Sequence, residues 1–214
     1  EIMLKLTLVR HGETEWNAQR RYQGHTDVPL SALGLHQAEL VADRLAGEKF
    51  DAIYASDLKR AWQTASPIAE KVGLPVSTEP RLREMSFGVL EGLKWEEAQK
   101  KYPEMLKAWL DDYNHPPEGG ESMDVFLARI AAFRDDLLSR HVSQNILLVA
   151  HGGTLNELIR SCLEVPNEQR WAFAFSMDNA SISELWLGDD GYPMLKRLNE
   201  SCHLNELAKD AKNA

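Results

Sequence analysis

The sequence has little cysteine and no long apolar run. Only two of its 214 residues are cysteines, Cys162 and Cys202, which is too few for the disulfide framework of a small secreted protein. No stretch approaches the roughly 18 consecutive apolar residues that a membrane-spanning helix needs. No basic segment followed by an apolar core suggests a secretory signal. We therefore expect a cytoplasmic protein with no membrane partner.

Positive charge is also scarce. Lys and Arg total 24 against 33 Asp and Glu, and the formal net charge is -9. A protein that binds the phosphates of a nucleic acid usually carries a basic face, so we expect no nucleic-acid partner. A small phosphorylated metabolite is not excluded, because a few arginines in a pocket set the local potential whatever the net charge.

Residue spacings typical of metal sites are missing as well. The seven histidines are scattered along the chain, with no His-Glu-x-x-His motif and no paired cysteines. We expect no metal and no other cofactor. Four of the histidines are expected to be ordinary loop or helix-surface residues: His25, His36, His115 and His141.

What the sequence does contain is an alternation of strand-like and helix-like segments. Short apolar runs predict strands at 4–9, 51–55, 146–150, 182–187 and 194–198. Helical periodicity predicts helices at 33–45, after Ser56, at 95–113, at 122–140 and after residue 151. This alternation indicates an α/β fold with three α/β/α layers, an open, mostly parallel sheet covered by helices on both faces. The expected organisation is one domain over 3–204, a helical lid insertion around 90–120, and a C-terminal tail at 205–214.

Two of the predicted strands end in the same kind of motif, Arg10-His11-Gly12 and His151-Gly152-Gly153. Ligands of open α/β sheets bind outside the carboxyl ends of the strands, so both histidines are placed for a site. The alternative is two structural histidines that donate to loop carbonyls. That alternative leaves Arg10 without a partner at a buried strand end, where an unpaired guanidinium is costly. A phosphoryl group would supply the partner, because the planar guanidinium matches phosphate oxygens.

Arg60 is a second candidate for the same site. It lies in the first turn of the helix after the second strand, off the apolar face and at the same edge of the sheet. Viewed alone, Arg60 has a simpler interpretation as a solvated helix charge.

Residues 8–17 (LVRHGETEWN) resemble the signature of the histidine phosphatase superfamily, in its phosphoglycerate-mutase-like branch. The resemblance continues to Leu198-Asn199 and covers nearly the whole chain. Its main further blocks are 22–24 (YQG), 27–31 (DVPLS), 56–61 (SDLKRA), 81–84 (RLRE), 119–122 (GGES) and 149–152 (VAHG).

The resemblance implies a role for each matching position. His11 is the implied nucleophile and Glu84 the implied proton donor and acceptor. The implied phosphate-binding groups are Arg10, Arg60, a protonated His151, Asn17, Gln23 and backbone amides near Gly24 and Gly152. His203 lies in a tail similar to those of some phosphoserine and α-ribazole phosphatases of the family, and could contact a substrate carboxylate.

Alternatives stay open at two of these positions. Glu84 could instead form a structural ion pair with Arg81 or Arg83, and His203 could be an ordinary surface histidine. A neutral imidazole attacks phosphorus only through an unprotonated ring nitrogen. We therefore expect the backbone around Gly12 to fix the His11 tautomer by accepting from the other ring nitrogen.

The implied function is metal-independent hydrolysis of a small phosphorylated metabolite through a phosphohistidine. Two alternatives are a phosphoglycerate mutase and a non-catalytic phospho-ligand binding module. The short, aromatic-rich segment 85–120 and the sequence EMSFG at 84–88, where family mutases have Glu-Arg-His-Tyr-Gly, favour the phosphatase. A binding module would be expected to have lost His11, Glu84 or an arginine. Phosphoserine, α-ribazole phosphate and sugar phosphates all stay open as substrates, and a homodimer is one assembly that the resemblance allows.

Overall fold

The computed structural model describes residues 2–188, 192–205 and 207, so most of the predicted tail lies outside the described residues. One sheet holds six strands, in the order β3-β2-β4-β1-β5-β6. These strands are β1 (Ile2–Arg10), β2 (Ala52–Ala55), β3 (Val76–Thr78), β4 (Gln144–Ala150), β5 (Ile182–Gly188) and β6 (Pro193–Glu200). The first four in spatial order are mutually parallel, and β5 and β6 run antiparallel to their neighbours.

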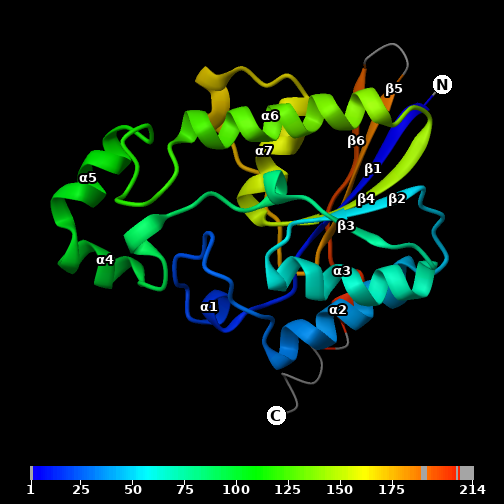
Figure 1. Cartoon of the computed structure of the whole chain (residues 1–214), viewed down its shortest axis with the longest axis horizontal. Helices are drawn as coiled ribbons and strands as arrows, with labels where there is room; N and C mark the ends of the chain where they lie inside the picture. The colour runs from blue at the N-terminus through cyan, green and yellow to red at the C-terminus, as the bar shows by residue number, and fades with distance from the viewer. Residues whose placement is uncertain (1, 189–191, 206, 208–214) are drawn as a thin grey trace.

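Helices cover both faces of the sheet (Figure 1). Helices α2 (Ala32–Leu45) and α3 (Lys59–Val72) lie on one face, and α6 (Met123–Arg140) and α7 (Gly152–Cys162) on the other. Strand β4 explains why both faces are apolar. Its alternate side chains Ile146, Leu148 and Ala150 pack into the α6 and α7 core, while Leu147 and Val149 pack into the α2 and α3 core. The predicted three-layer, mostly parallel α/β/α architecture is confirmed.

Two short helices, α4 (Trp95–Lys101) and α5 (Pro103–Asp111), lie at one end of the molecule, away from the sheet (Figure 1). They have a small core of their own, built on Leu90, Ala98, Leu106 and Trp109. The helix predicted at 95–113 is thus divided in two, and Pro103 is the first residue of the second helix, where a proline is tolerated because its position needs no N–H donor. That this segment acts as a lid stays a prediction.

Several elements carry too weak a pattern to be predicted. Helix α1 (Glu15–Ala18) is one turn long and depends on a capping box between Thr14 and Asn17. Strand β3 has only three residues, at the edge of the sheet. The described chain also has four short 3-10 helices: η1 (Pro80–Leu82), η2 (Gly88–Leu90), η3 (Asn167–Ala172) and η4 (Cys202–Leu204).

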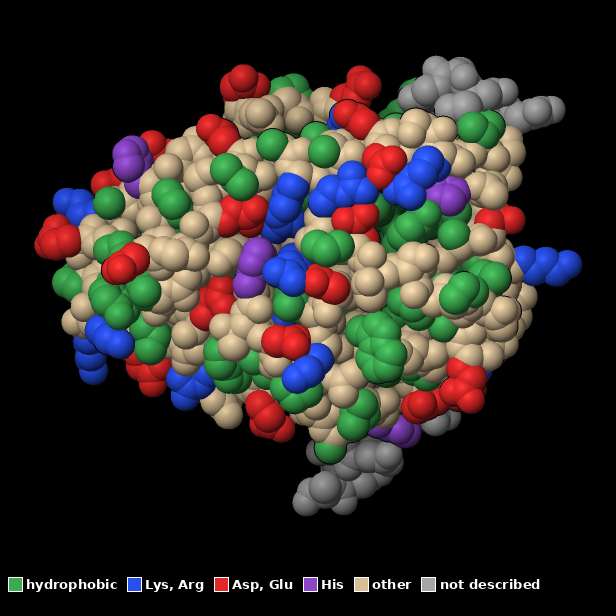
Figure 2. All heavy atoms as spheres, in the orientation of Figure 1, with side chains coloured by type: hydrophobic (Ala, Val, Ile, Leu, Met, Phe, Trp, Pro, Cys, Tyr) green, Lys and Arg blue, Asp and Glu red, His purple; other side chains and the backbone are tan. Residues whose placement is uncertain are grey.

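The surface agrees with the composition. No helix in the described part of the chain is both long and apolar enough to span a bilayer. On the face that Figure 2 presents, acidic and basic side chains intermingle rather than gather by sign.

Candidate active site

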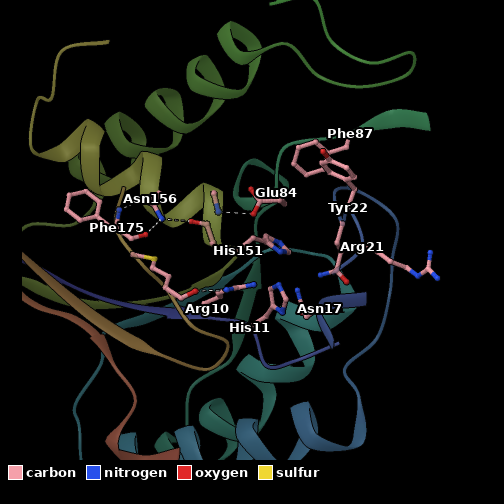
Figure 3. Close-up of a pocket in the computed structure, with 14 residues that line it drawn as sticks. Arg10, His11, Asn17, Arg21, Tyr22, Glu84, Phe87, His151, Asn156 and Phe175 are labelled. Atoms are coloured by element: carbon pink, nitrogen blue, oxygen red, sulfur yellow. Dashed lines mark hydrogen bonds between the residues drawn. The ribbon is translucent and has the colours of Figure 1, made fainter. Parts of the chain in front are cut away.

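The two histidine motifs meet at the carboxyl ends of neighbouring strands. Strands β1 and β4 pair in parallel with Arg10 opposite Ala150, and the His11 N–H donates to the Ala150 carbonyl at 2.9 Å. The chain therefore leaves both strands at the same level. The His11 and His151 rings lie edge to face with centroids 5.1 Å apart (Figure 3).

The His11 ring is held as one neutral tautomer. Its Nδ1–H donates to the Gly12 carbonyl at 2.7 Å, so its Nε2 carries no proton. The side chain is only 2% exposed. Burial, followed by the charges of Arg60 and Arg10, holds the pKa of His11 well below its ordinary value. The expectation that the Gly12 backbone fixes this tautomer is confirmed.

Contacts from distant parts of the chain fix the Gly12 loop. The Gly12 N–H donates to Thr64 Oγ1 at 3.0 Å, and Asn179 Nδ2 donates to the His11 carbonyl at 3.0 Å. A Cβ at Gly12 would lie 2.5 Å from the Gly34 carbonyl oxygen, and one at Gly34 would lie 2.0 Å from the Glu13 oxygen. The loop and the start of α2 therefore touch backbone to backbone, which only glycine permits.

Arg10 brings a guanidinium into the pocket, and its buried Nε–H has no acceptor there among the described residues. Its Nη1 donates to the Met177 carbonyl. Burial lowers the pKa of Arg10, and the charges of Glu84 and Asp178 oppose that effect. A Cβ at Gly152 would lie 3.5 Å from this Nε. A phosphoryl oxygen is the kind of acceptor that the unused donor requires.

Arg60 is not a solvated helix charge, because its side chain is 0% exposed. It donates to the Gly24 carbonyl at 2.6 Å, to the Thr26 carbonyl at 3.0 Å and to His151 Nδ1 at 3.2 Å. Burial lowers the pKa of Arg60 to about 10, so it stays charged at neutral pH. Gly24 thus contacts the Arg60 guanidinium through its carbonyl. Because Arg60 also bonds to the His151 ring, it lies behind that ring.

His151 is neutral and has both ring nitrogens occupied. A guanidinium N–H can only donate, so Nδ1 accepts from Arg60 and Nε2–H donates to Ser56 Oγ at 2.8 Å. Burial, then the charge of Arg60, holds the pKa of His151 well below its ordinary value. His151 is therefore neutral in this arrangement, and its protonation during phosphoryl transfer stays a prediction.

The Glu84 carboxylate lies at the N-terminal end of α7. Its oxygens accept from the backbone N–H groups of Gly153 at 2.9 Å, Thr154 at 3.1 Å and Met85 at 3.0 Å. A Cβ at Gly153 would lie 2.5 Å from Glu84 Oε1, so this glycine makes room for the carboxylate.

The alternative ion pair of Glu84 does not form. Arg81 pairs with Glu79 and Asp136, and Arg83 pairs with Asp57. Glu84 therefore faces the pocket without a salt-bridge partner from its own segment.

Asn17 and Gln23 present amide groups to the pocket. Asn17 Oδ1 accepts from the Thr14 N–H at 3.1 Å, and Gln23 Oε1 accepts from the Thr14 hydroxyl at 2.6 Å. Because Thr14 engages both oxygens, the two NH₂ groups remain as donors for a ligand.

These groups surround one cavity of about 410 Å³. The residues that line it are Arg10, His11, Asn17, Arg21, Tyr22, Gln23, Glu84, Phe87, His151, Gly152, Gly153, Asn156, Phe175 and Met177. Of the predicted site residues, Arg60, Gly24 and His203 do not line it. The His203 ring bonds instead to the Ala180 carbonyl at 2.9 Å, so the structure does not bring it into the pocket.

The outer part of the cavity has two walls, and the sequence did not predict that their residues would lie together. Tyr22 and Phe87 form one wall, with ring centroids 5.5 Å apart. Phe175 and Met177 form the other. The Asn156 amide fixes it by donating to the Phe175 carbonyl at 2.8 Å and accepting from the Phe175 N–H at 3.0 Å (Figure 3).

No group of three or more His, Cys, Asp or Glu side chains in the described ranges is arranged to hold a metal ion.

Comparisons with known proteins agree with this geometry. The family model for the histidine phosphatase superfamily (branch 1) matches residues 6–201. The chain is 38% identical to phosphoserine phosphatase 1 of Hydrogenobacter thermophilus over 99% of the chain and all of that protein. It is 42% identical to a probable phosphoglycerate mutase GpmB of Yersinia enterocolitica, over 97% of the chain and 98% of that protein.

A solved structure gives the same assignment. The crystal structure of a putative alpha-ribazole-5'-P phosphatase from Escherichia coli superposes with a TM-score of 0.84 at 35% identity, covering 92% of this chain and 96% of that one. The chain therefore belongs to the histidine phosphatase superfamily.

Proposed function

We propose that this phosphatase hydrolyses small phosphomonoesters by passing the phosphoryl group through Nε2 of His11. The observation that carries the proposal is the hydrogen bond from His11 Nδ1 to the Gly12 carbonyl. It leaves Nε2 with a lone pair in a buried, neutral ring, directed at a pocket that holds a guanidinium and a carboxylate.

In the first step His11 Nε2 forms a bond to phosphorus while the bond from phosphorus to the ester oxygen breaks. Arg10 offsets the charge on the phosphoryl oxygens from the cavity wall and Arg60 from behind His151, and the Asn17 and Gln23 amides donate to these oxygens. Glu84, which enters this step as the carboxylic acid, gives its proton to the departing alkoxide, so that an alcohol leaves.

In the second step water attacks the phosphohistidine. Glu84, now a carboxylate, takes a proton from that water, and the electron pair of the P–N bond returns to His11. Inorganic phosphate leaves, and Glu84 and His11 are restored to their starting protonation states.

Direct trapping of the intermediate tests this function. The enzyme is mixed with p-nitrophenyl phosphate, quenched in alkali, in which phosphohistidine survives, and mapped by mass spectrometry. Phosphate on His11 that disappears on acid treatment is the expected result. Steady release of phosphate with no label on His11 during turnover would reject the proposal.

The pocket favours hydrolysis over the mutase reaction. Among the described lining residues, the cations are Arg10 and Arg21. Arg21 already donates to the Gly92 carbonyl at 2.6 Å and to Glu97 at 2.9 Å, and it extends away from His11 (Figure 3). A phosphoglycerate carboxylate therefore lacks a dedicated partner beside the transferring group.

The 42% identity with a probable phosphoglycerate mutase makes the mutase the second candidate. Incubation of 3-phosphoglycerate with a bisphosphoglycerate primer separates the two functions. A phosphatase releases phosphate, whereas a mutase yields 2-phosphoglycerate with little release. The substrates named for the relatives, phosphoserine and α-ribazole 5'-phosphate, are the first phosphomonoesters to rank by kcat/KM.

A further inference from the structure

Glu84 lies in a segment without regular secondary structure, between η1 and the isolated bridge at Phe87. A loop does not by itself hold a carboxyl group at a fixed distance from a substrate. Proton transfer requires heavy atoms within hydrogen-bond reach, and a misplacement of about 1 Å can cost about 100-fold in rate. Something outside the loop must therefore fix its path.

One guanidinium gathers the carbonyl groups of this loop. Arg129, on α6, donates through Nη1 to the Arg81 carbonyl at 2.8 Å and to the Arg83 carbonyl at 2.7 Å. Its Nη2 donates to the carbonyl of Glu84 itself at 2.8 Å. Three carbonyls on both sides of the Glu84 side chain thus converge on one side chain 45 or more residues away in the sequence.

Glu121 orients this guanidinium. Its carboxylate accepts from Arg129 Nε at 2.8 Å and from Nη2 at 2.9 Å, so all five N–H groups of the arginine are used. The two side chains are only 17% and 10% exposed. Glu121 belongs to the 119–122 block, to which the proposed reaction assigns no role.

We propose that Arg129, oriented by Glu121, is a positioning residue for the proton transfer by Glu84. It holds the loop so that the carboxyl group reaches the leaving-group oxygen, and it touches neither substrate nor His11. This inference rests on the proposed function, since it assigns a partner to the proton donor of that reaction. A lysine cannot replace the arginine, because one ammonium lacks the planar fork that spans three carbonyls and a carboxylate.

The test uses two aryl phosphates that differ in their need for a proton. The p-nitrophenolate ion leaves without one, whereas the more basic phenolate ion needs it. Values of kcat/KM report the transfer to His11. In Arg129→Lys we expect kcat/KM for phenyl phosphate to fall about 10- to 100-fold, and that for p-nitrophenyl phosphate to fall less than about threefold.

Two companion variants make the result specific. Combined with Glu84→Gln, Arg129→Lys should cause no further loss on phenyl phosphate, because the group that it positions is already gone. Arg134→Lys is the matched control, since Arg134 lies on the same helix and donates to Ser161 of α7 instead. It should leave the ratio of the two substrates unchanged.

Equal losses on both substrates, or additive losses in the Glu84→Gln background, would overturn the inference. If Arg129→Lys fails to fold, Glu121→Gln carries the same comparison, because it keeps the side-chain shape and removes the orienting charge. Failure of the proposed function gives a different result, in which the unmodified enzyme forms no phosphohistidine at all.

Discussion

The loops that follow β1 and β4 both begin with the dipeptide His-Gly, and yet the two histidine rings have different hydrogen-bond partners. Both rings are buried and neutral. In His11, Nδ1 bonds to the carbonyl of its own loop and Nε2 keeps its lone pair. In His151, Nδ1 accepts from Arg60 and Nε2 donates to Ser56. The hydrogen-bond partners of each ring, rather than its burial or its place in the sheet, therefore distinguish the proposed nucleophile from the proposed supporting group.

The sharpest way to break this comparison is to remove the free nitrogen. In His11→Asn the new amide can still donate to the Gly12 carbonyl, but nothing remains to attack phosphorus. We expect kcat to fall by about 10⁴-fold or more, with no phosphohistidine detected by alkaline quench and mass spectrometry. A variant that retains a tenth of the activity would reverse the assignment.

The same substitution at the other histidine should cost less. In His151→Asn the amide oxygen can still accept from Arg60, and the nucleophile is intact. We expect kcat/KM to fall by about 10²- to 10³-fold while His11 still becomes phosphorylated. Label on His151 instead of His11 in the unmodified enzyme would show that His151 is the nucleophile.

A smaller effect is expected when only the partner of His151 is removed. Ser56→Ala leaves the buried Nε2–H without an acceptor, which costs about 1–3 kcal/mol of unfolding free energy, and we expect about a tenfold loss in kcat/KM. Urea unfolding and steady-state kinetics measure the two effects. Ser66→Ala is the matched control, because the partly exposed Ser66 hydroxyl donates to the Trp62 carbonyl of its own helix, and it should show neither effect.

The effect with the least bearing on catalysis concerns the lowered pKa that the two histidines share. Both folded-state pKa values lie below the ordinary value, so below about pH 6.5 the unfolded chain binds more protons than the folded one. The unfolding free energy should therefore be highest, with respect to these two groups, above about pH 6.5. Below that pH it should fall by up to about 1.4 kcal/mol per pH unit for each histidine.

Urea unfolding between pH 5 and pH 8 measures this slope. His11→Asn and His151→Asn should each flatten it, and the substitution His115→Asn, at an exposed position, should leave it unchanged. Equal slopes in all four proteins would show that the buried rings are not the cause.

Much of the fold followed from local pattern. The apolar runs of β1 and β4 are strong because both strands are buried over most of their length, and the spacing in α6 is clear because the helix buries one face, at Phe126, Ile130, Phe133 and Leu137. Strand β3 and helix α1 escaped prediction because they are short and depend on neighbours. Ser56 shows the limit of local rules: it stands where a helix N-cap is expected, but the cap position is Leu58, and its hydroxyl serves His151.

The residues of the site also fall into those that the sequence predicted and those that it missed. The two strand-end motifs predicted a site with His11, Arg10 and His151, the family resemblance added Glu84, and all four line one cavity. Thr64, Asn179 and Arg129 were missed, because each acts through a hydrogen bond to a backbone group far away in the sequence. Such a bond leaves no spacing to recognise. His203 was misplaced for the opposite reason, since a resemblance between tails does not fix the direction of a ring.

The contact between the Gly12 loop and Gly34 limits how this enzyme can be re-engineered. Neither position has room for even a methyl group, so the loop that carries His11 cannot be altered by substitution there. Substitutions aimed at new substrates are better placed in the outer walls of the cavity, around Phe87 and Phe175. A library of variants at those wall positions would change which substrates fit while leaving the His11 loop in place.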